Sequence, residues 1–192
     1  MPKAKVTKDM IVEAGFMIVR DEGENMLNVR NVASILGCST QPVMYCYPTV
    51  SEMKSAVLER ANEFHTAYLI QNRSAGEDIL LSIGMNYIRF AYHEKHLFRF
   101  IVMSDKAQAG GISELITSDD SGMLDPLARQ KGLTTEQMKD VFEALFVSFH
   151  GYATLVSQDA LRFDELHCKR QLMRIYDGVT DRVRESREFA EI

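Results

Sequence analysis

The polar residues that could do chemistry are most concentrated in one short segment, Gly37 to Tyr47. In chain order its polar candidates are Ser39, Thr40, Gln41 and Tyr45. Hydroxyls and main-chain amides at the start of a helix can hold phosphates, while glutamine can pair bidentately with adenine. Tyr45 is predicted on the exposed side of such a helix, whereas Val43 and Met44 are predicted to point inward. This pattern predicts nucleic-acid reading rather than catalysis.

The flanking sequence must position that segment. Apolar spacing predicts a helix that begins after Thr7, carries an inner stripe at Ile11, Ala14, Gly15 and Ile18, and ends at Gly23. A second helix is predicted from the Asn28 cap to Gly37, a third from Ser39 or Thr40 to about Tyr47, and a fourth from Thr49 past Tyr68. Two short helices joined by a tight glycine turn are typical of a helix-turn-helix. The spacing alone leaves an ordinary helical hairpin equally open.

Composition limits the function classes. The 192 residues are 46% hydrophobic and 26% charged, with a formal charge of −5, which predicts a folded soluble chain. The first 60 residues balance their acids and bases, so the negative charge belongs to the remainder. Lys3, Lys5 and Lys8 favour a short arm that follows phosphates. No apolar run reaches the roughly 20 residues of a bilayer span, and we expect a cytoplasmic protein without a membrane partner.

Helical periodicity continues beyond a polar stretch near residues 71–76, and no alternating run predicts a sheet. We expect an all-α chain of about nine to ten helices, divided into a head at 1–48, a connecting helix at 49–74 and a bundle at 75–192. Later helices are predicted at about 77–94, 97–105, 112–118, 123–131, 135–159 and 164–187.

Other reactive residues give little support for an enzyme. His93 and His96 stand three apart without a third ligand at a recognisable spacing, so we expect no metal and no cofactor. Cys38 and Cys46 flank the third predicted helix, but no basic cluster marks either thiol as activated. No nucleophile elbow, phosphate loop or carboxylate pair has supporting context, and no catalytic residue is assigned.

Residues 7–64 resemble the DNA-binding domain of the TetR (tetracycline repressor) family. The matching features are the Gly23 stop, the run Asn28 to Ala33 leading to Leu36 and Gly37, and Tyr47-Pro48 before the fourth helix. The string Ser39 to Met44 is similar to a subgroup with Ser-Thr-Gln-Pro-Ile-Tyr there. Met44 departs from the usual aromatic residue and Val50 from a frequent lysine, whose phosphate contact Lys54 could replace.

The resemblance implies a DNA site, a dimer and an effector pocket. The implied DNA-binding residues are Lys3, Lys5, Arg30, Ser39, Thr40, Gln41, Tyr45, Tyr47, Thr49 and Lys54. A homodimer through the last two helices would place two reading helices about 34–36 Å apart on a pseudo-palindromic operator. The expected interface residues are Leu155, Leu172, Tyr176, Val179 and Val183. These stripes could instead be the core of a monomer.

A small apolar or amphipathic effector is expected inside the C-terminal bundle, where pockets are mainly apolar with a few polar groups. The candidate lining residues are Tyr87, Phe90, Phe98, Met103, Phe142, Phe146, Phe149 and His150. A filled core is the alternative for each of them. The sequence thus predicts a ligand-responsive DNA-binding regulator, more specifically a repressor. One alternative is an activator of the same fold. The other is a helical small-molecule-binding protein or enzyme whose N-terminal hairpin is only structural.

Overall fold

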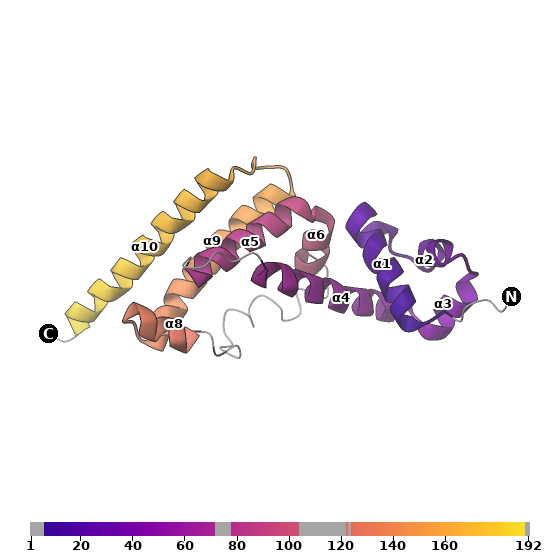
Figure 1. Ribbon diagram of the computed structural model, residues 1–192, viewed down its shortest axis with the longest axis horizontal. Coiled ribbons are helices and arrows are strands. Elements are labelled where there is room, and N and C mark those ends of the chain that lie inside the picture. Colours follow the sequence, from indigo (N-terminus) through magenta and orange to yellow (C-terminus); the bar gives the residue numbers. More distant parts are fainter. Residues whose placement is uncertain (1–5, 72–77, 104–121, 123, 191–192) are drawn as a thin grey trace. The chain divides into compact units, whose positions relative to one another are not determined.

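The computed structural model describes residues 6–71, 78–103, 122 and 124–190, and the described residues form helices joined by turns, without a strand (Figure 1). The helices are α1 Lys8–Glu22, the 3-10 helix η1 Glu24–Met26, α2 Val29–Ile35, α3 Thr40–Cys46, α4 Val50–Ile70, α5 Ile79–His93, α6 Lys95–Met103, α8 Leu124–Lys131, α9 Thr135–Ser157 and α10 Glu165–Ala190. The all-α prediction is confirmed. The helix predicted at 112–118 lies outside the described residues. None of the described helices is long and apolar enough to cross a bilayer.

The chain divides into two units by its internal contacts. The first unit contains residues 1–68 and 93–108, and the second contains residues 69–92 and 109–192. Helix α6 therefore belongs to the unit that holds the N-terminal helices. The functional division at residues 48 and 74 remains a prediction.

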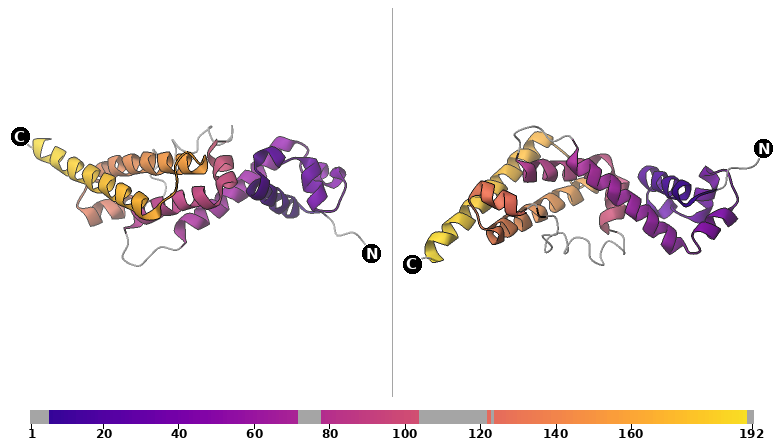
Figure 2. Two further views of the ribbon diagram at one scale, coloured as in Figure 1. Left: turned by 90° about the horizontal axis from the view of Figure 1, so that it is seen from above. Right: turned by 60° about the horizontal axis from the view of Figure 1, so that its bottom comes forward.

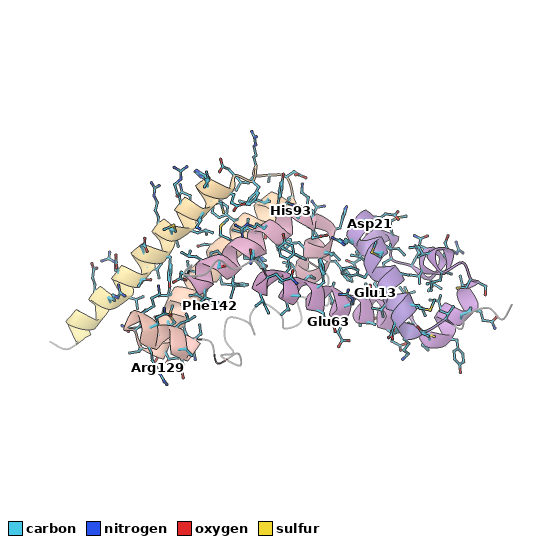
Figure 3. All side chains as sticks on the ribbon, in the orientation of Figure 1. Glu13, Asp21, Glu63, His93, Arg129 and Phe142 are labelled. Carbon is cyan, nitrogen blue, oxygen red and sulfur yellow. The ribbon has the colours of Figure 1, made fainter. Side chains whose placement is uncertain are left out.

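In the first unit α1 packs against α6, η1 and α2, and several of its residues also contact α4. All four residues of the predicted α1 stripe are buried. Gly15 allows close approach, because a Cβ at this position would lie 2.6 Å from Val57 Cγ2. Phe16 packs edge-on against Phe64 with ring centroids 5.4 Å apart. The side chain of Glu13, labelled in Figure 3, accepts a hydrogen bond from Arg60 and adds an exposed link between the same two helices.

An ion pair joins α1 to the start of α6 within the same unit. Arg20 Nε donates to Glu94 Oε2 at 2.8 Å, and Arg20 Nη2 donates to Glu94 Oε1. Glu94 immediately precedes α6, and its carbonyl accepts from Phe98 N at 2.8 Å. Phe98 is fully buried. The pair therefore fixes the end of α1 against an apolar α6 face.

Local caps set the helix boundaries predicted from the sequence. Thr7 Oγ1 accepts from Met10 N at 3.3 Å, and Asn28 Oδ1 accepts from Asn31 N at 3.0 Å. Gly23 has a φ of 92° and Gly37 a φ of 60°, values that favour glycine. Each glycine therefore ends a helix where a side chain would be strained.

The second unit is a bundle in which α9 packs with both α8 and α10. Figure 2 shows α10 lying beside α9 in both views. Apolar residues of α5, α9 and α10 form the core, including Ile88, Leu145, Ala153 and Leu172, each fully buried. Gly84 of α5 lies against the ring of Phe149, which is possible only because glycine has no Cβ.

A polar cluster joins three elements of this bundle. Asp78 caps α5, with its Oδ1 accepting from Leu80 N at 3.0 Å. Its Oδ2 accepts from the Tyr176 hydroxyl at 3.0 Å and from Lys131 Nζ at 2.6 Å. Burial alone would raise the pKa of Asp78, but hydrogen bonds from Lys131 and Tyr176 outweigh it and lower the pKa below 3.8.

We expect Asp78→Asn to lower the free energy of unfolding by about 1–2 kcal/mol, because the charge-assisted bonds are lost. Since the folded-state pKa lies below the unfolded value, the carboxylate stabilises the fold above the unfolded pKa and loses this effect as pH falls through the folded pKa. Urea unfolding from pH 7 down to pH 3 checks both points. The variant should lose stability less steeply than the parent below pH 4, and the exposed Asp140→Asn serves as control. Parallel curves would contradict the assignment.

Candidate nucleic-acid interface

Helices α2 and α3 form a tight pair around one turn. Cys38 N donates to Ala33 O at 3.0 Å, and Gly37 N donates to Ser34 O at 3.2 Å, which closes the end of α2. Val32 of α2 and Val43 of α3 are fully buried. The packed pair is therefore a helix-turn-helix in geometry, with α3 as its second helix.

The exposed face of α3 carries the predicted reading residues. Tyr45 is 86% exposed, and Thr40 and Gln41 are also exposed. Gln41 and Tyr45 are four residues apart, so they share one helix face opposite the buried Val43. An amide and a phenol side by side on a surface helix offer both a donor and an acceptor to a base edge.

Met44 does not point inward as predicted, because it is 41% exposed. The helical turn of about 100° per residue explains the error. Val43 and Tyr47, four apart, face the core, with Tyr47 only 9% exposed, and Met44 is rotated out of that direction. The Lys8 ammonium lies 5.3 Å from the centroid of the Tyr47 ring. Tyr47 therefore contributes packing, and its predicted DNA contact gains no support from its position.

The other described N-terminal candidates lie at or near the starts of α2, α3 and α4. Ser39 caps α3 by its backbone, and no cap hydrogen bond from its side chain is present in the described structure. Thr49 Oγ1 accepts from Glu52 N at 3.2 Å and so begins α4. Arg30 is exposed on the first turn of α2. Lys54 Nζ is paired with Glu24 Oε1 at 3.0 Å, so a phosphate would compete with that carboxylate. Lys3 and Lys5 lie outside the described residues.

Several of the residues predicted to line a pocket form one aromatic row in the second unit. Phe142, labelled in Figure 3, Phe146 and His150 follow one another at four-residue spacing on α9 and are all partly exposed. Phe146 stacks on the His150 ring with centroids 6.0 Å apart. Tyr87 of α5 hydrogen-bonds His150 Nδ1 through its hydroxyl at 3.0 Å. Burial lowers the pKa of His150 and raises that of Tyr87, so both rings are neutral at pH 7.

The remaining pocket candidates do not join this row. Phe90 is fully buried, and Phe149 is 6% exposed against Gly84. Phe98 belongs to the first unit and not to the bundle. The side chain of Met103 lies outside the described part of the chain.

The structure divides the predicted interface residues into two groups. Leu172 is fully buried and Tyr176 is 5% exposed within the single chain, which leaves neither available to a partner. Val179 and Val183 are partly covered. Leu155, by contrast, is 47% exposed. Leu172 and Tyr176 therefore lie in the core of the single chain, and the dimer interface remains a prediction.

Sequence reasoning missed other exposed apolar residues on α9 and α10. Val147 on α9 is 60% exposed, and Leu166 and Met173 on α10 are 75% and 43% exposed. Val147, Gly151 and Leu155 are spaced four apart, so they share a face of α9. Among the described residues, apart from the adjacent backbone of α9, no heavy atom lies within 4 Å of where a Cβ at Gly151 would stand, which leaves its surface open. The four-residue spacing on α9 was the signal that could have found this face.

Comparisons with known proteins give a fold and no family. A solved structure described as the crystal structure of a TetR-like transcriptional regulator from Rhodococcus sp. RHA1 is similar to this chain with a TM-score of 0.59 and 14% identity. The alignment covers 92% of this chain and 96% of that one. No family model and no curated protein sequence matches. The chain thus shares the fold of that TetR-like regulator, as the sequence resemblance implied, whereas its recognition-helix subgroup remains a prediction.

Proposed function

We propose that this protein is a DNA-binding transcriptional regulator that reads a pseudo-palindromic operator as a homodimer, represses from it, and is released by a small-molecule effector. The observation that carries the proposal is the exposed Gln41 and Tyr45 face of α3, held by the buried Val43 on a helix-turn-helix. The repressor role follows from the family resemblance. Enrichment of duplexes from a random-sequence library by the purified protein tests the proposal, because a reader of bases enriches one dyad sequence.

Arg30→Ala is expected to weaken binding to the operator and to random DNA by the same factor. The reason is that an exposed guanidinium on the first turn of α2 would contact phosphate and not a base edge. The slope of log affinity against log salt concentration, which is negative, should become less steep by about 1. Anisotropy titrations at several salt concentrations measure both quantities. A loss confined to the operator would contradict a phosphate contact.

The proposed dimer face consists of Val147, Gly151 and Leu155 on α9 with Leu166 and Met173 on α10. Its occupant is a second copy of this chain, since the family resemblance implies association through these two helices. The open surface at Gly151 lets a partner helix approach closely. Two heads on one symmetric operator require such an association.

Leu155→Asp is expected to raise the dimer dissociation constant at least tenfold, because pairing would bury an unpaired carboxylate. Sedimentation velocity over a concentration series measures the change. Met17→Asp is the matched control, since Met17 is 44% exposed on α1 in the other unit. Equal dissociation constants for the parent and Leu155→Asp would place the interface elsewhere.

The proposed effector site is the row Phe142, Phe146 and His150 with Tyr87. Partly exposed aromatic rings beside a neutral hydrogen-bonded Tyr–His pair suit a small apolar molecule with one polar group. Such an effector releases DNA only to the extent that it binds the non-reading conformation more tightly. The proposal assigns no catalytic residue, and no metal-binding group occurs among the described residues.

A further inference from the structure

The carboxyl end of α4 is held by one buried side chain. The last carbonyls of a helix have no partner within the helix. Asn86 of α5, only 2% exposed, donates through Nδ2 to Leu69 O at 3.0 Å and to Gln71 O at 2.8 Å. A single carboxamide thus satisfies two carbonyls where α4 ends. The orientation of this carboxamide depends on which group donates a hydrogen bond to its oxygen.

The Asn86 oxygen is oriented by Arg89, one helical turn further along α5. Arg89 Nη1 donates to Asn86 Oδ1 at 2.8 Å, and Arg89 Nη2 donates to Glu165 Oε1. Glu165 is the first residue of α10. Polar contacts therefore run without a gap from the first turn of α10 through Arg89 and Asn86 to the last turn of α4.

The two ends of this chain of contacts matter for different reasons. Helix α4 is one continuous helix whose earlier turns pack in the first unit through Met53, Val57 and Ala61. Glu165 adjoins Leu166, which is 75% exposed and part of the proposed dimer face. We infer that Asn86 and Arg89 are positioning residues that couple the first turn of α10 to the carboxyl end of α4.

The coupling acts through geometry. A guanidinium holds two acceptors in a fixed fork, so a shift of Glu165 changes the direction in which Arg89 presents its other nitrogen to Asn86. Asn86 must then release or tighten its two carbonyl contacts. The effect on DNA binding rests on the proposed function, whereas the link between α10 and α4 does not.

The link is tested by hydrogen exchange of the full chain without DNA. Glu165→Gln and Arg89→Met should each speed exchange of the last-turn α4 amides, residues 67–70, by about two- to fivefold, the range expected for a partly exposed ion pair. Glu185→Gln is the matched control, because Glu185 pairs with Arg182 within α10 itself. Asn86→Asp, which loses both donors, should show a larger change if it folds. Unchanged α4 exchange in Glu165→Gln would overturn the coupling and leave Asn86 as a local cap.

The consequence is tested by operator affinity of the same variants. Arg89→Met and Glu165→Gln should each weaken operator binding about threefold, and the double variant should be no weaker than Arg89→Met, because both remove one contact chain. Random-DNA affinity should not change. If the losses of operator affinity in the two single variants multiply in the double variant, the coupling to DNA binding is overturned. If the parent enriches no operator, the proposed function fails, and the exchange result still decides the link.

Discussion

Replacing Gln41 by alanine is expected to weaken operator binding by about 1–3 kcal/mol, and Tyr45→Ala by a similar amount. Both side chains lie on the exposed face of α3, and neither contributes to its packing, which Val43 provides. The loss should therefore appear in specific affinity without a change in the unfolding temperature. Anisotropy titration against the enriched operator and against random DNA measures the difference.

Two controls separate reading from general surface effects. Tyr45→Phe retains the ring and removes the hydroxyl, so it should lose only the part of the affinity that depends on hydrogen bonding. Gln130→Ala changes an exposed glutamine on α8 of the second unit and should have no effect. Unchanged operator affinity in both Gln41→Ala and Tyr45→Ala would exclude α3 as the reading helix.

Gly84→Ala should destabilise the second unit by about 1–3 kcal/mol. A Cβ at this position would lie 2.2 Å from Phe149 Cζ and 2.3 Å from Cε2, distances that require the ring or the helix to move. Phe149 is 6% exposed, so the ring has little room to do so. The cost of this clash should exceed the gain of up to about 1 kcal/mol that replacing a helical glycine by alanine usually brings.

Gly178→Ala is the matched control for that prediction. It also lies in a long helix, but among the described residues, apart from the adjacent backbone of α10, no heavy atom lies within 4 Å of its added Cβ, so a small stabilisation is expected. In a Phe149→Leu background the cost of Gly84→Ala should fall, since the ring is gone. Chemical denaturation of the four variants measures these energies. Equal effects of Gly84→Ala and Gly178→Ala would show that the close approach is absent.

The features predicted well from the sequence depend on neighbours along the chain. Thr7 and Asn28 cap helices because their side chains reach amides three residues on, and Gly37 ends α2 because it tolerates a positive φ. The period of 3.6 residues likewise places Ile11 and Ile18 inside. Local chemistry decides each of these helix boundaries, whereas the choice of a helix-turn-helix over an ordinary helical hairpin depended on the family resemblance.

The features predicted poorly depend on which distant element covers a face. An apolar stripe shows that a face is covered and not what covers it, so Leu172 was assigned to a partner although it is buried within the chain. Phe98 was grouped with the bundle, whereas α6 packs on α1. Asn86 gave no signal, because its partners are carbonyls 15 and 17 residues earlier in the chain.

The most direct test of the central claim is an anisotropy titration of the purified full chain against its enriched duplex, with random DNA as competitor, at several salt concentrations. The account predicts saturable binding about 1,000-fold or more tighter than to random DNA, with a two-fold symmetric footprint. Affinity for the enriched duplex equal to that for random DNA would contradict the assignment of α3 as a reading helix.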